Sequence, residues 1–230
     1  MQITFINVGY GDAILFQCAN GCTILLDGGS ALESEFAGDP FRVRCADFLR
    51  QRDIRRLDAV IISHIHEDHV CGLEPVFQQI PVGRIFVPYP LEPFLEGREL
   101  RPAPDAFRSV PLYTNALNAY RRILMQASER GVPISVTSPG DSLRLSPDLL
   151  VQTLAPRPAA LQAYVELLRR AYAAENGGEA VTDCLTKLDA MSNQTSLLLR
   201  IEAEKTVFLS AADSCPREWT EVPSFLLENV

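Results

Sequence analysis

The chain has 230 residues, of which 47% are hydrophobic and 22% charged, and its formal net charge is −8. These values are ordinary for a globular protein with a full core, and the acidic balance argues against passive binding along a nucleic-acid backbone. No apolar run approaches the roughly 20 residues that cross a bilayer, and a strand pattern starts at Met1 in place of a signal peptide, so we expect a cytoplasmic protein without a membrane segment.

The hydrophobic pattern predicts short strands and helices in alternation, opening with a β-meander whose runs are separated by glycine-containing turns. Residues 88–111 are rich in proline and have no clean period, so we expect a long surface loop of the kind that covers an active site. Strands are expected at 3–8, 13–16, 23–26, 57–62, 84–88, 133–137, 143–145, 150–154, 196–202 and 206–211, and helices at 41–52, 72–80, 112–130, 159–175, 183–190 and 216–229. No interdomain linker is evident, and residues 1–230 are expected to form one domain.

Residues 42–56 carry six arginines and two aspartates, a local excess of positive charge in an acidic chain. Our preferred interpretation is a solvated helix face, and the alternative is a surface that contacts phosphate groups. The six cysteines form no Cys-x-x-Cys pair, which favours reduced and mostly buried thiols. Cys215 lies two residues beyond Asp213, which leaves a ligand role open for it.

All three histidines of the chain stand within the segment Ser63–His69, in a His-x-His-x-Asp-His pattern. Histidines with only structural roles would be scattered, so this clustering predicts a shared metal site. The segment follows the apolar run Leu57–Ile62, which places the ligands at the carboxyl end of a buried strand. Nitrogen and carboxylate donors together suit zinc, manganese or iron, and two such ions would activate a bridging water and stabilise a charged transition state.

Five segments together resemble the metallo-β-lactamase-fold hydrolases, and more narrowly the soluble domain of the DNA-internalisation competence proteins. These segments are Phe5–Leu15, Leu25–Gly29, Ser63–His69, Asn193–Leu197 and Leu209–Asp213, and they occur in the family's order. The resemblance implies an α/β fold, namely an αββα sandwich of two facing sheets with helices outside. It also implies two divalent metal ions, with Zn or Mn favoured.

The resemblance assigns metal ligands position by position. His64 and His66 would bind the first metal, and Asp68 and His69 the second. Asp213 would bridge both, although the end of a strand is also a place for a simple capping carboxylate. Asp68 is in addition the residue expected to hold or deprotonate the attacking water.

Four further residues would support these ligands or position the substrate. Asp27 would orient a ligand histidine from the second layer, and Asp12 would support the same loop, unless it only stabilises its own turn. Many superfamily members supply another histidine before the bridging aspartate, which this sequence lacks. The competence branch instead has an Asn-x-x-Ser pattern, matched by Asn193 and Ser196.

The chain stops at Val230, before the strand, histidine-containing loop and closing elements that the family adds after its bridging aspartate. We therefore expect an incomplete fold, preferably a fragment of a longer protein, with completion by a partner or a degenerate site as alternatives. The leading functional hypothesis is a metal-dependent phosphodiesterase or nuclease-like hydrolase acting on nucleic acid or a nucleotide. The alternatives are an esterase, thioesterase or lactamase-type hydrolase, and a non-catalytic metal-binding interaction or effector domain.

Overall fold

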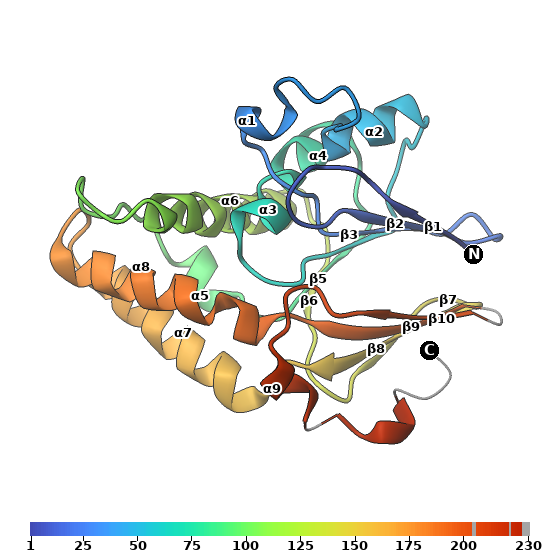
Figure 1. Ribbon diagram of the computed structural model, residues 1–230. Helices are drawn as coiled ribbons and strands as arrows, with labels where there is room; N and C mark the ends of the chain where they lie inside the picture. Colours follow the sequence, from blue (N-terminus) through green and yellow to red (C-terminus); the bar gives the residue numbers. More distant parts are fainter. Residues whose placement is uncertain (204–205, 221, 227–230) are drawn as a thin grey trace.

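Two β-sheets lie face to face in the computed structural model, which describes residues 1–203, 206–220 and 222–226 (Figure 1). The first sheet has the order β1-β2-β3-β4-β5-β6 and is antiparallel from β1 to β3 and parallel from β3 to β6. Its strands are β1 (Gln2–Phe5), β2 (Ile14–Gln17), β3 (Thr23–Leu26), β4 (Ala59–Ile61), β5 (Ile85–Val87) and β6 (Ile134–Val136). The second sheet has the order β10-β9-β8-β7 and is antiparallel throughout. Its strands are β7 (Ser142–Ser146), β8 (Leu149–Ala155), β9 (Leu198–Ala203) and β10 (Thr206–Ser210).

The space between the sheets is filled by one face of each strand. In β8 every second residue is buried, as a period of two requires for a strand with one face in a core. Phe16 and Ile61 of the first sheet belong to the same apolar cluster as Val151 and Ile201 of the second. The strands β3, β4 and β5 are buried on both faces, which explains their continuous apolar sequence.

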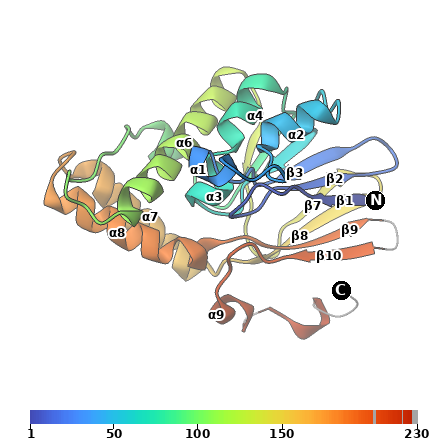
Figure 2. The ribbon, with the colours of Figure 1, turned by 45° about the horizontal axis from the view of Figure 1, so that its top comes forward.

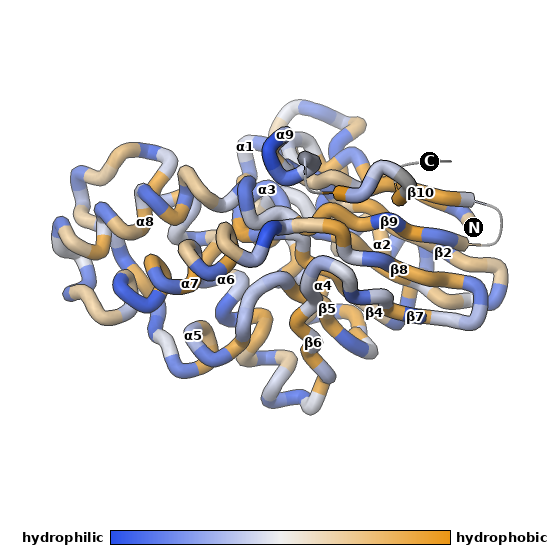
Figure 3. Tube along the Cα trace, turned by 90° about the horizontal axis from the view of Figure 1, so that it is seen from below, coloured by the Kyte–Doolittle hydropathy of each residue, from blue (hydrophilic) through white to orange (hydrophobic). Residues whose placement is uncertain are grey.

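Helices cover the outer face of the first sheet. The apolar cluster on that face joins strand residues such as Leu25 and Val60 to the helices α2 (Cys45–Gln51), α4 (Leu73–Gln79) and α6 (Ser109–Glu129). The helices α7 (Pro158–Ala173) and α8 (Glu179–Ser192) pack against each other, and α8 packs on α6. Viewed from below, this pair lies beside the second sheet and not across it (Figure 3). Short helices α1 (Glu33–Phe36), α3 (Glu67–Val70) and α5 (Glu92–Leu95) lie in the connections.

The C-terminal segment packs on the outer side of the second sheet (Figure 2). Val222 and Trp219 contact Ala155 and Leu198 there, and the buried carboxylate of Glu218 accepts hydrogen bonds from Arg157. The single helix expected at 216–229 is wrong, because the segment forms α9 (Pro216–Trp219) and a separate 3₁₀ turn, η2 (Ser224–Leu226). Pro223 has no N–H to continue a helix and disfavours helical backbone at the residue before it. Residue 221 and residues 227–229 lie outside the described part of the chain.

The α/β sandwich with outer helices confirms the fold class expected from the sequence, and most elements start or end within a few residues of their expected positions. Residues 88–111 differ from the expected loop, because they contain α5 and bury Tyr89, Phe94 and Leu100 in the core. The helix expected from residue 112 begins at Ser109, since Pro111 falls in the first turn, where no backbone N–H is needed. Among the described residues, no helix combines the length and the apolar character needed to cross a membrane.

Candidate metal centre

The histidine segment lies at the carboxyl ends of two neighbouring parallel strands. β3 leads into Asp27, and β4 leads through Ile62 and Ser63 into His64. His69 lies on α3, and Asp213 follows β10 of the other sheet. The sandwich therefore brings polar side chains from both sheets together at one end.

Each histidine ring has one nitrogen held by a polar group and the other facing a neighbouring candidate ligand. His64 Nδ1 lies 3.0 Å from Ser63 Oγ, and His66 Nε2 lies 3.3 Å from Asp189 Oδ1. His69 Nδ1 lies 2.9 Å from Asp27 Oδ2. On the opposite sides, His64 Nε2 and His66 Nδ1 are 3.1 Å apart, and His69 Nε2 is 3.6 Å from Asp213 Oδ1. Such outer contacts fix ring orientation and tautomer in metal-binding histidines.

Asp27 holds the loop after β4 in place. Its carboxylate accepts hydrogen bonds from the Ser63 N–H at 2.8 Å and from the Ser63 hydroxyl at 2.5 Å, in addition to its contact with His69. The side chain is fully buried, and its backbone has a φ of 56°, an uncommon left-handed conformation for a residue other than glycine. A strained backbone at a buried polar cluster is typical of a functional site.

Asp213 lies close to the first two histidines as well. One ligand atom each of His64, His66 and Asp213 can be chosen so that all lie within 4.8 Å of one another. Asp68 lines the adjacent groove, and its charge acts on both Asp12 and His69. Cys215 is not part of this group, although it follows Asp213 closely in sequence.

The electrostatic environment of the histidines is uneven. Burial lowers the pKa of His64, and the neighbouring His69 and His66 lower it further. Burial alone would also lower the pKa of His69, but the hydrogen bond to Asp27 and the charges of Asp27, Asp68 and Asp213 raise it to about 9. Burial raises the pKa of Asp12, where His69 opposes the effect and the other carboxylates add to it. The carboxylates therefore favour positive charge at His69, whereas burial keeps His64 neutral, the form in which an imidazole binds a metal.

Several buried polar atoms at this end have no hydrogen-bond partner within the described residues. They are His69 Nε2, Asn193 Oδ1 and Ser196 Oγ. The segment that carries the last two is fixed to the histidine loop, because Leu197 N–H donates to Ser63 O and Ser192 Oγ donates to Ile65 O. Buried polar atoms without partners are costly, so these atoms point to a ligand that would satisfy them.

The sequence profile of the metallo-beta-lactamase superfamily matches residues 6–165. The chain belongs to the metallo-beta-lactamase superfamily.

Among curated relatives, it is 31% identical to "Endoribonuclease ysh1" of Schizosaccharomyces pombe over 93 residues, which cover 38% of this chain and 12% of that protein. It is 24% identical to "ComE operon protein 3" of Bacillus subtilis over 166 residues, which cover 67% of this chain and 18% of that protein. The second match agrees with the competence-protein relation expected from the motifs. The chain thus spans less than a fifth of the length of either relative.

Two solved structures are similar to this chain at lower sequence identity than these relatives. Zn²⁺-bound PqqB from Methylobacterium extorquens is 13% identical, with a TM-score of 0.38 over 84% of this chain and 49% of that one. A mutant metallo-beta-lactamase from Cronobacter sakazakii is 12% identical, also with a TM-score of 0.38, over 66% of this chain and 50% of that one.

The donor set of this superfamily member fits divalent metal. Three imidazole nitrogens and the Asp213 carboxylate converge, and imidazole with carboxylate is a donor combination for zinc and manganese. The unpartnered His69 Nε2 is the clearest sign, because a buried ring nitrogen next to a carboxylate 3.6 Å away is placed for a shared cation. Superfamily members are mostly metal-dependent hydrolases, which agrees with this chemistry.

Sequence reasoning missed Asp189. This residue lies on α8, and both its carboxylate and its carbonyl oxygen are 3.3 Å from His66 Nε2. Burial by itself would raise the pKa of Asp189, but the hydrogen bonds to His66 and Ser109 lower it, which keeps the carboxylate charged. No local motif marks Asp189 in the sequence. Its only signal is its position one helical turn before Asn193.

The arginines of residues 42–56 mostly form surface ion pairs, as the preferred interpretation of that segment requires. Arg42 pairs with Glu35 and Asp39, Arg44 with Glu33, and Arg50 with Asp47. Their charge is largely neutralised and is not available as a continuous phosphate-binding face.

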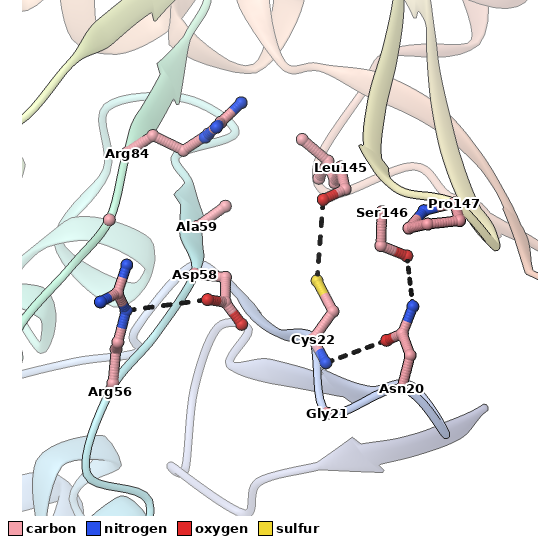
Figure 4. A pocket seen from close by; sticks show the side chains of 11 residues that line it. Asn20, Gly21, Cys22, Arg56, Asp58, Ala59, Arg84, Leu145, Ser146 and Pro147 are labelled. Carbon is pink, nitrogen blue, oxygen red and sulfur yellow. Dashed lines mark hydrogen bonds and ion pairs between the residues drawn. The ribbon is translucent and has the colours of Figure 1, made fainter.

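A cavity of about 550 Å³ lies at the opposite end of the sandwich. It is formed at the amino ends of β3, β4 and β5 and at the β7–β8 turn (Figure 4). Arg56 and Arg84 line one side, but Asp58 lies beside them and interacts with Arg56 at 3.7 Å. None of the histidines lines this cavity, so it is separate from the candidate metal centre.

Proposed function

We propose that this chain is a metal-dependent phosphodiesterase whose substrate is nucleic acid or a nucleotide. The observation that carries the proposal is the convergence of His64 Nε2, His66 Nδ1, His69 Nε2 and Asp213 Oδ1. The other nitrogen of each ring contacts a polar side chain, namely Ser63, Asp189 or Asp27. The similarity to a protein named as an endoribonuclease supports the choice of a phosphodiester over other hydrolysable bonds.

Two divalent ions, Zn²⁺ or Mn²⁺, are the cofactors that this arrangement favours. His64 and His66 would hold one, Asp68 and His69 the other, and Asp213 would lie between them. Bound there, the metals would supply a Lewis acid for the phosphoryl oxygens and make water acidic enough to ionise near neutral pH.

The protein's own groups would do the remaining work. Asp68, which lines the groove next to His66, would accept the proton of the attacking water. Asn193 Oδ1 and Ser196 Oγ are buried without partners and would orient the substrate or a metal ligand. Asp27 and Asp12 would hold the histidine loop in its active geometry.

The test is hydrolysis by the purified chain, supplied with Mn²⁺ or Zn²⁺, of single-stranded DNA, duplex DNA, RNA and bis-p-nitrophenyl phosphate. Chromogenic ester and lactam substrates are assayed in parallel, with His64→Ala as the inactive control. Phosphodiester cleavage that disappears in the control supports the proposal. If only the ester or the lactam is cleaved, the substrate is not a phosphodiester. If no substrate is cleaved and the protein binds one metal ion per chain or none, the chain is a binding domain.

A further inference from the structure

A groove of about 350 Å³ leads from the candidate metal centre to the surface. His66 and Asp68 line its inner part, Tyr10 lies on the turn after β1, and Arg108 and Ser109 lie at the start of α6. Among the helices labelled in Figure 1, α1, α3, α6 and α8 contribute to this groove. Tyr10 and Arg108 therefore line the same groove as His66.

The acidic side chains of the groove are mostly satisfied by neighbours. Glu35 pairs with Arg42 at 3.1 Å, and Asp189 lies 3.3 Å from His66. Glu67 accepts hydrogen bonds from Ser30 Oγ at 2.8 Å and from the Ala31 N–H at 2.9 Å. These carboxylates are therefore held in fixed contacts along the groove wall.

Arg108 differs from these groups. Its side chain is exposed, and within the described part of the chain no hydrogen bond, ion pair or ring contact involves its guanidinium. A free guanidinium has five N–H donors in a plane and matches a phosphate group in two-point geometry. It is thus available to an anionic substrate without first breaking an internal ion pair.

Tyr10 provides an exposed aromatic surface in the same groove. Its side chain is 69% exposed, although the flanking Gly9 and Gly11 have φ values of 87° and 79° that fix the turn. The Tyr10 N–H donates to Glu35 Oε2 at 3.4 Å, which ties the turn to α1. The guanidinium carbon of Arg42 lies 5.9 Å from the centroid of the Tyr10 ring, and the exposed part of this ring can stack on a nucleobase.

We propose that this groove binds single-stranded nucleic acid, with Arg108 on a backbone phosphate and Tyr10 stacked on a base. The proposal rests on the proposed function and narrows its substrate class. A net charge of −8 disfavours long-range attraction of a duplex, so affinity must come from a few local contacts. Stacking on Tyr10 needs a base that is free of its pair, which selects a single strand.

The experiment compares wild type with Arg108→Gln, Tyr10→Ala and Tyr10→Phe, and uses Arg170→Gln on the exposed side of α7 as the matched control. Metal content and thermal unfolding are measured first and are expected to equal wild type, because both groove residues are exposed. KM is then measured for a single-stranded oligonucleotide, and binding of a labelled copy is followed by fluorescence anisotropy. We expect KM and Kd to rise about tenfold in Arg108→Gln and Tyr10→Ala, and to stay near wild type in Tyr10→Phe and Arg170→Gln.

Bis-p-nitrophenyl phosphate has no base, so Tyr10→Ala is expected to leave its hydrolysis unchanged. Equal KM and Kd for wild type, Arg108→Gln and Tyr10→Ala on the oligonucleotide would overturn the groove proposal, as would tighter binding of the matching duplex. If wild type cleaves no phosphodiester, the proposed function fails, and the anisotropy comparison still decides whether the groove binds a single strand.

Discussion

His69 Nδ1 donates a hydrogen bond to Asp27 Oδ2 at 2.9 Å, and the two side chains are 1% and 0% exposed. Asp27 also accepts hydrogen bonds from the backbone and hydroxyl of Ser63. One buried carboxylate therefore fixes the loop after β4 and the ring of a candidate ligand at the same time. Because Asp27 is buried, water cannot take over its hydrogen bonds. Loss of its negative charge is therefore expected to affect both the loop and the His69 ring.

Replacement Asp27→Asn is expected to weaken Zn²⁺ binding by about 10- to 100-fold. The amide keeps one acceptor oxygen but turns an NH₂ group toward groups that donate, which leaves buried donors without partners. The free energy of unfolding should fall by about 1–3 kcal/mol. Isothermal titration with Zn²⁺ and urea denaturation measure the two effects. Asp47→Asn, which removes only a surface pair with Arg50, should change neither, and an unaltered Zn²⁺ affinity in Asp27→Asn would exclude this role.

Asp189→Ala is expected to reduce metal affinity about tenfold, because His66 would lose the carboxylate that holds its Nε2. Titration of the metal-free protein with Co²⁺, followed by visible absorption, reports both affinity and coordination geometry. Asp183→Ala on the same helix removes an exposed pair with Lys187 and serves as the control. If the two variants give the same spectrum and affinity as wild type, Asp189 does not position His66.

The sequence predicted strands at 23–26 and 57–62, and the family resemblance, not strand geometry, suggested a role for Asp27. The structure pairs these strands in parallel, so their carboxyl ends are neighbours and Asp27 lies close to the histidine segment. The αββα class was implied by the family resemblance of the five ordered segments, and the superfamily match and the two sheets confirm it.

Other parts depended on contacts that no local pattern encodes. Asp189 is one acidic residue among several on α8, and only the packing of α8 against α6 brings it to His66. The proline content of residues 88–111 suggested an exposed loop, yet Phe94 and Leu100 are buried there against the helices. In both cases the deciding interaction joins residues that are distant along the chain.

Gly11→Ala is expected to displace Asp68 and to destabilise the protein. A Cβ at Gly11 would lie 1.7 Å from the carbonyl oxygen of Asp68, and the φ of 79° is unfavourable for alanine. Gly21→Ala separates the effect of the backbone conformation from that of the steric clash. Gly21 has a similar φ of 86°, but nothing lies within 4 Å of a Cβ added there. Urea denaturation should show a loss of about 1 kcal/mol for Gly21→Ala and a clearly larger loss for Gly11→Ala. Equal losses would mean that the contact with Asp68 adjusts without cost.

The six cysteines are free thiols, and their burial predicts an order of reaction with Ellman's reagent. Cys215 and Cys22 are partly exposed, whereas Cys45 is buried and burial raises its pKa to about 12. Burial also raises the pKa of Cys22 to about 11, so at pH 8 its thiolate fraction is roughly 100-fold lower than that of an ordinary thiol.

Native protein at pH 8 should therefore show one fast thiol, Cys215, and a slow phase from Cys22 whose rate rises with pH up to about 11. Cys215→Ser should remove the fast phase, and all six thiols should react after denaturation. A fast phase that persists in Cys215→Ser, or rapid labelling of Cys45 in the native protein, would contradict the packing described for these residues.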